Sequence, residues 1–116
     1  MNDGSGLPKA IQRELDRARQ ARREGNEGKV RVSARRAAGQ AIQAYFIKEG
    51  KHFEALSALD YIAELAESDE ISNQVREILS HLAQRVVKNA PEEDSYWPLE
   101  ADLITETEVL IRELLG

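Results

Sequence analysis

The sequence predicts an all-α protein, an antiparallel up-and-down bundle of four to five helices in one domain that spans residues 1–116. Apolar residues recur at spacings of three and four along most of the chain, and no segment alternates apolar and polar residues as a strand would. With 116 residues, 41% hydrophobic and 32% charged, the chain can bury one hydrophobic core. Short connections between the helical segments favour antiparallel neighbours.

The first predicted helix begins near Pro8, a residue tolerated in a first turn, and ends at Gly25. Asn26 follows this break and is a residue type that caps the start of a helix. The apolar positions of the first helix form a narrow stripe: Leu7, Ile11, Leu15, Ala18 and Ala21.

The second predicted helix spans residues 29–49 and ends at Gly50. Gly39 lies inside it and costs up to about 1 kcal/mol of helix propensity, which indicates a packing reason for a glycine there. Small side chains at helical spacing let another helix approach closely, so we expect this helix to be central. These small residues are Ala34, Ala37, Ala38, Ala41 and Ala44.

The third helix is expected over residues 51–67 and the fourth over residues 70–89, with Ser68-Asp69 as the stop and the new cap between them. The inward positions of the third are Phe53, Leu56, Leu59, Ile62, Ala63 and Ala66. Those of the fourth are Ile71, Val75, Ile78, Leu79, Leu82 and Val86.

Residues 90–98 contain two prolines and no periodicity, and they predict a loop. A last helix is expected from Leu99, with Glu100 and Asp102 in its first turn, where the helix dipole favours acidic side chains. Together the segments predict a core that includes Ala38, Ala41, Leu56, Leu59, Val75, Ile78, Leu82, Leu103 and Leu110.

The charge is divided unequally along the chain. Residues 1–58 hold 12 Lys and Arg against 7 Asp and Glu, whereas residues 59–116 hold 4 against 14. Such polarity is typical of a phosphate-binding face, of two faces that attract each other in an oligomer, or of a solvated helix surface. If the basic region binds nucleic acid, the candidate residues are Arg19, Arg22, Arg23, Arg35 and Arg36.

Composition argues against metal and membrane chemistry. The chain has no Cys and only two His, which excludes a disulfide framework and a His-rich zinc centre, and we predict no cofactor and no metal. The longest apolar run, residues 44–47, is far shorter than the ~20 residues that cross a bilayer. The first residues lack the features of a signal peptide, so we expect a cytoplasmic protein.

Arg76 and His81 lie five residues apart in the fourth helix, in the segment REILSH. Residues 34–50, ARRAAGQAIQAYFIKEG, form an alanine-rich helix that ends in a lysine and a glycine, and His52 then begins the next segment, HFEAL. In these features residues 28–90 resemble the HEPN family of small α-helical bundles, which includes nucleotide-binding domains and metal-independent ribonucleases.

The resemblance implies that Arg76 and His81 are catalytic, in a site that combines residues of two chains, and that a nucleotidyltransferase or antitoxin is a partner. Histidine exchanges protons near neutral pH, and arginine stabilises developing phosphate charge. Within one helix these two residues are about 140° apart, so they cannot share one phosphate in a single straight helix. The competing interpretation is that Glu77, His81 and Arg85 form a surface ladder of charge pairs.

Two functions from different classes therefore remain open. The first is a HEPN-like bundle that acts on or binds RNA or nucleotides. If it is an enzyme, it is expected to be a metal-independent toxin-type ribonuclease. The alternative is a non-catalytic bundle for dimerisation or partner docking. In either case, the narrow first-helix stripe, the alanine-rich helix and the opposite charges predict a homodimer.

Overall fold

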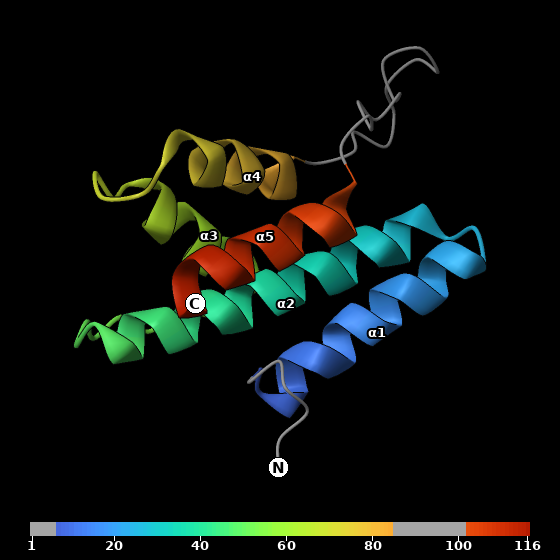
Figure 1. Ribbon diagram of the computed structural model, residues 1–116, viewed down its shortest axis with the longest axis horizontal. Helices are drawn as coiled ribbons and strands as arrows, with labels where there is room; N and C mark the ends of the chain where they lie inside the picture. The colour runs from blue at the N-terminus through green and yellow to red at the C-terminus, as the bar shows by residue number, and fades with distance from the viewer. Residues whose placement is uncertain (1–6, 85–101) are drawn as a thin grey trace.

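The computed structural model describes residues 7–84 and 102–116, and these residues form five helices without a strand. Figure 1 shows them packed as a helical bundle, which confirms the predicted all-α class. The predicted loop over residues 90–98 lies outside the described residues. The helices are α1 (Lys9–Arg23), α2 (Glu27–Lys48), α3 (Ala58–Ala66), α4 (Asn73–Ala83) and α5 (Leu103–Leu115).

The longest helix, α2, is the centre of the bundle and contacts each of the other four. In Figure 1 it crosses the middle of the molecule, with α1 running back along it and α5 lying against it. Its alanine face is what permits this: Ala34, Ala37, Ala38 and Ala41 are completely buried. The prediction that α2 is central is confirmed.

Local side chains set most helix ends. Gly25 and Gly50 both adopt a φ of 75°, a left-handed conformation that favours glycine, and they follow α1 and α2 as predicted. Four helices begin at a side chain that accepts a hydrogen bond from a backbone N–H of the first turn: Asn26 for α2, Ser57 for α3, Ser72 for α4 and Asp102 for α5.

Three predicted helix starts are wrong, and the fourth helix ends at Ala83 instead of residue 89. The third helix begins at Ala58 instead of residue 51, because Ser57 caps it and the preceding residues are not helical. The fourth begins at Asn73, with Ser72 as its cap in place of Ser68-Asp69. The last begins at Leu103, and Asp102 is its cap and not a residue of its first turn.

The late start of α3 also changes the predicted core. Leu56 precedes the helix and is fully exposed, at 101% of its reference area, so its predicted burial is wrong. Leu59 is only partly buried, and Ala63 is exposed because α3 turns Ile62 and Leu65 inward instead. The other predicted core residues are buried: Ala38, Ala41, Val75, Ile78, Leu82, Leu103 and Leu110.

Close packing against α3 explains the glycine at position 39 of α2, as the sequence predicted. A Cβ atom at this residue would lie 2.8 Å from the Cβ of Ala58 and 2.9 Å from its Cα. The start of α3 therefore crosses α2 at a residue that has no side chain.

Candidate functional site

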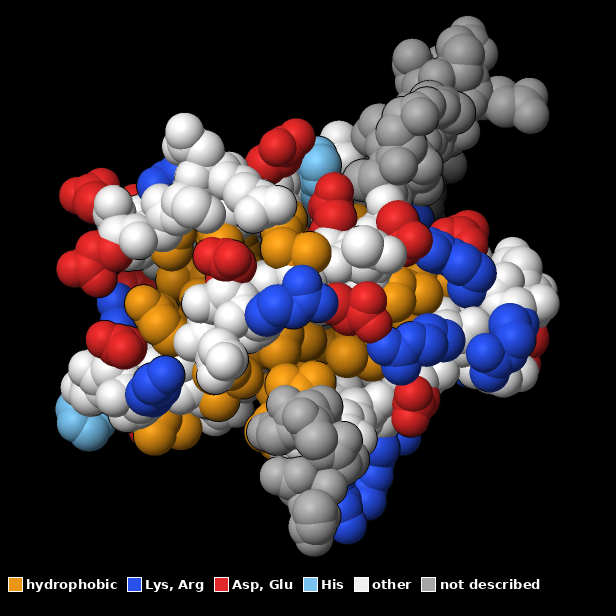
Figure 2. All heavy atoms as spheres, in the orientation of Figure 1, with side chains coloured by type: hydrophobic (Ala, Val, Ile, Leu, Met, Phe, Trp, Pro, Cys, Tyr) orange, Lys and Arg blue, Asp and Glu red, His pale blue; other side chains and the backbone are white. Residues whose placement is uncertain are grey.

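The basic end of the bundle is held by carboxylates of the same chain. Figure 2 shows Lys and Arg side chains gathered on the right of the view, with acidic side chains among them. Arg19 of α1 forms ion pairs with Asp16, at 3.0 Å, and with Glu108 of α5. Arg22 of α1 pairs with Asp102, at 2.6 Å. The opposite charges of the two halves of the sequence thus meet within one molecule.

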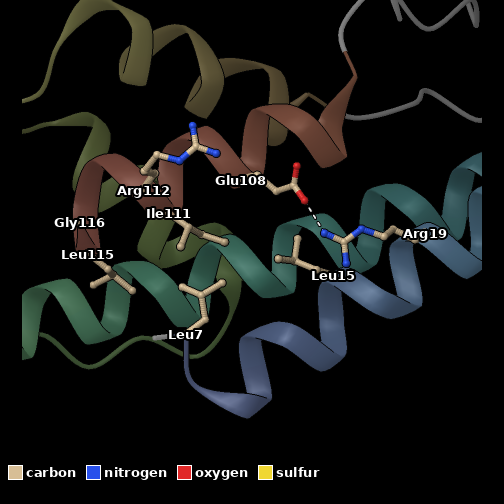
Figure 3. Close-up of a pocket in the computed structure, with 8 residues that line it drawn as sticks. All are labelled: Leu7, Leu15, Arg19, Glu108, Ile111, Arg112, Leu115 and Gly116. Atoms are coloured by element: carbon tan, nitrogen blue, oxygen red, sulfur yellow. Dashed lines mark hydrogen bonds and ion pairs between the residues drawn. The ribbon is translucent and has the colours of Figure 1, made fainter. Parts of the chain in front are cut away.

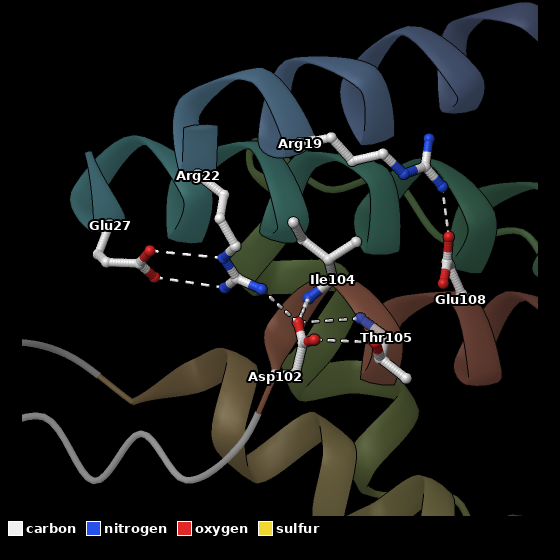
Figure 4. A network of polar contacts seen from close by, with 7 residues as sticks. All are labelled: Arg19, Arg22, Glu27, Asp102, Ile104, Thr105 and Glu108. Atoms are coloured by element: carbon white, nitrogen blue, oxygen red, sulfur yellow. Dashed lines mark hydrogen bonds and ion pairs between the residues drawn. The ribbon is translucent and has the colours of Figure 1, made fainter. Parts of the chain in front are cut away.

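Figure 4 shows how this network joins the adjacent helices α1 and α2 to α5, which is distant from them in sequence. One oxygen of Asp102 accepts hydrogen bonds from the backbone N–H groups of Ile104 and Thr105, at 3.1 and 3.3 Å, and so caps α5. The same carboxylate accepts from Arg22, which also pairs with Glu27 at 3.3 Å. The Asp102 hydrogen bond raises the pKa of the Arg22 guanidinium.

Asp102 gives a prediction about stability. Burial alone would raise the pKa of its carboxyl, but hydrogen bonds from Arg22 and Thr105 outweigh burial and lower the pKa. The ionised carboxylate therefore stabilises the fold above about pH 4, its ordinary pKa when unfolded, and this contribution is lost as the pH falls further. Asp102→Ala is expected to lower the free energy of unfolding at pH 7 by about 1 kcal/mol, since it removes the cap of α5.

Asp102→Asn is the matched control, because asparagine caps a helix as well as aspartate does but cannot pair with Arg22 as an ion. Urea unfolding at pH 7 should show a small loss for this variant, because the pair is about half exposed. Below pH 4 its difference from the parent chain should shrink. Equal losses for the two variants at pH 7 would assign the stabilisation to the ion pair and not to the cap.

The other three predicted nucleic-acid-binding arginines occupy different places. Arg23 donates to the side chain of Gln20, at 2.6 Å. Arg35 donates to the carbonyl oxygens of Leu82, at 2.5 Å, and of Gln84, so it ties α2 to the end of α4. Arg36 is exposed, and within the described part of the chain no residue accepts a hydrogen bond from it.

Arg76 and His81 contact different elements, as their angular separation on α4 predicts. The guanidinium of Arg76 donates to the carbonyl oxygens of Ala66, at 2.8 Å, and of Ser68, at 3.0 Å, and so holds the end of α3. His81 instead faces α5, where its Nδ1 is 2.8 Å from an oxygen of Glu106. One chain therefore does not bring these two side chains together.

Glu106 is the residue that sequence reasoning missed. It follows His81 by 25 positions and belongs to another helix, so no spacing rule connects the two. The predicted ladder partner Glu77 lies 3.9 Å from Nε2 of His81, and Arg85 is outside the described residues. Because an ionised carboxylate only accepts, Nδ1 is the donor in the contact with Glu106. Nε2 does not take part in that hydrogen bond.

A groove lies between α1 and α5. It has a volume of about 480 Å³, and Figure 3 shows apolar side chains from both sides in it, with the Arg19–Glu108 pair across one end. Its apolar lining consists of Leu7, Leu15, Ile111 and Leu115. Arg19, Glu108 and Arg112 are the charged residues of the lining.

The outer side of α2 and residues 51–57 form a second surface, which we call the connection face. It has two adjoining hollows of about 290 and 530 Å³, and Gln43 and Leu56 line both. Arg36 lines only the smaller hollow, whereas Ile47 and Glu54 line only the larger. Besides the fully exposed Leu56, Ile47 is 70% exposed, so apolar area is concentrated on this face.

In residues 7–84 and 102–116, no three His, Asp or Glu side chains gather as a metal ion would require. Nor does any helix in these ranges have the length and apolar character to cross a membrane. What the described chain defines is an all-α helical bundle. Comparison with protein-family models, with curated proteins and with solved structures gives no match.

Proposed function

We propose that this chain is a non-catalytic dimerisation bundle, in which α2 and the segment after it present the contact surface. The observation that carries the proposal is the exposure of Leu56 and Ile47 beside two hollows. Burying a leucine or isoleucine side chain is worth about 1.5–3 kcal/mol, and grouped apolar exposure of this kind marks protein contact sites.

The placement of the arginines supports the same proposal. Arg19 and Arg22 are matched by carboxylates, and Arg35 and Arg76 bind backbone carbonyl oxygens. Binding of RNA phosphates by these side chains would require them to give up intramolecular partners. An apolar protein contact on the connection face requires no such exchange.

The experiment that tests this function is a mass measurement of the full chain by light scattering at micromolar concentration. The expected result is a particle of twice the chain mass of 13.0 kDa. It should persist at high salt, because contacts that bury apolar area are not screened by ions. A particle of 13.0 kDa would contradict the proposal.

A second candidate function is favoured by the contact between His81 and Glu106. A carboxylate that holds one ring nitrogen fixes the orientation of the imidazole, which leaves Nε2 to exchange a proton with a substrate. The His81 side chain is 30% exposed, enough for contact with a ligand. This arrangement supports a metal-independent ribonuclease or a nucleotide-binding bundle. The resemblance to the HEPN family adds a nucleotidyltransferase or antitoxin as its proposed partner.

In this second candidate, Arg76 of the same chain cannot be the cation that binds the phosphate beside His81. Arg76 of the same chain is directed to the end of α3. A site that combines His81 of one chain with Arg76 of another satisfies the requirement.

A further inference from the structure

We infer that two copies of this chain associate about a two-fold axis that passes close to Leu56, with each Leu56 entering a hollow of the other copy's connection face. The inference rests on the proposed dimerisation function and adds the surface and its pairing. Leu56 is exposed to its full extent and lines both hollows of its own chain. A projecting side chain next to a hollow is self-complementary under a two-fold rotation, in which each copy supplies both parts.

The larger hollow suits an incoming leucine. Its wall includes the rings of Phe53 and Tyr61, whose centroids are 5.7 Å apart and whose planes meet at 73°. Phe46 packs against both rings, at 5.9 and 6.2 Å, and is itself buried. This part of the wall is therefore apolar and is held in place by the aromatic cluster, whereas Lys51, His52 and Glu54 line other parts of the hollow.

The charges on either side of Leu56 match under the same rotation. Arg36 lies at the smaller hollow and Glu54 at the larger, so a two-fold axis near Leu56 places Arg36 of one copy opposite Glu54 of the other. Both side chains are exposed, and within the described residues neither forms an ion pair. The rotation thus pairs a cation with an anion twice, which fixes the orientation of the two copies.

The test is light scattering of the full chain and of the Leu56→Asp variant over a dilution series. The variant is expected to raise the dimer dissociation constant at least about 100-fold, because it puts a carboxylate into an apolar contact in both copies. Its circular dichroism should be unchanged, since Leu56 is fully exposed in the single chain. Val32→Asp is the matched control: Val32 is a 42% exposed apolar residue of α2 that lines neither hollow, and this variant should remain dimeric.

A charge exchange tests the orientation. Arg36→Glu and Glu54→Arg should each weaken the dimer, because each places like charges opposite one another, and the double variant should restore it. A dimer that Leu56→Asp leaves intact, or that Val32→Asp weakens as much, would overturn this surface while leaving the dimerisation function in place. Failure of the double variant to recover would overturn the two-fold pairing of Arg36 with Glu54. A parent chain of 13.0 kDa would overturn the function itself.

Discussion

The His81→Ala variant is expected to cleave single-stranded RNA at least about 100-fold more slowly than the parent chain if the ribonuclease function is right, because a general acid–base group contributes about 10²–10⁴-fold. Glu106→Gln should also slow cleavage, since the amide no longer holds the charge of the imidazolium, although it can still orient the ring. Arg76→Ala should act as strongly as His81→Ala, and the double variant should lose little more than either single one, because residues that act as a unit are not additive. Cleavage should survive EDTA.

Arg76→Ala needs a control because Arg76 also anchors the end of α3. Circular dichroism and thermal unfolding of each variant separate lost chemistry from lost fold. Mixing the two inactive single variants should restore part of the activity if the site combines residues of two chains, since one of the two composite sites is then intact. No cleavage by the parent dimer, or cleavage that persists in the double variant, would leave the dimerisation bundle as the function of this chain.

Gly39→Ala is expected to destabilise the protein by about 1–3 kcal/mol, although alanine is the better helix former by up to about 1 kcal/mol. The new Cβ would meet Ala58 at 2.8 Å from its Cβ and 2.9 Å from its Cα, and the second of these is backbone that cannot turn away. Either α3 moves off α2 or the contact stays strained. Thermal unfolding should show the midpoint lowered by several degrees.

Gly28→Ala is the matched variant in the same helix. The atom nearest to its new Cβ would be the side-chain oxygen of Asn26, at 3.7 Å, which is ordinary contact. This variant should therefore keep or gain stability, because only the propensity term acts. If Gly39→Ala proved as stable as Gly28→Ala, the close crossing of α2 and α3 would not be a constraint on the fold.

The parts of the fold that the sequence predicted are those set by local chemistry. The helical periods, the stops at Gly25 and Gly50 and the cap at Asn26 each depend on a few adjacent residues. The start of α3 was also locally encoded: Ser57 caps the helix, and Asp60, three residues later, accepts a hydrogen bond from the N–H of Leu56, in the manner of a capping box. The three-residue spacing of Ser57 and Asp60 thus predicts a helix start at Ala58, which places Leu56 outside the helix and outside the core.

The contacts that define the candidate sites were not predictable in this way. Arg22 and Asp102 are 80 positions apart, and His81 and Glu106 are 25 apart, so only the packing of α5 brings them together. Charge composition left open a phosphate-binding face, attraction between oppositely charged faces and a solvated surface. It did not distinguish attraction within a molecule from attraction between molecules, and the structure places these pairs within one chain.

The central position of α2 has a consequence for synthesis on the ribosome. Helices α1 and α2 are adjacent in sequence and pack against each other, so this hairpin can form as soon as both have emerged. The side of α2 that α5 covers stays open until residues 103–115 have been made. This apolar face of α2 is therefore uncovered between its own synthesis and that of α5. Several residues of this face are alanines, which have the smallest apolar side chain. The nascent chain therefore exposes little apolar area there, and α5 can still pack closely against α2 once it has formed.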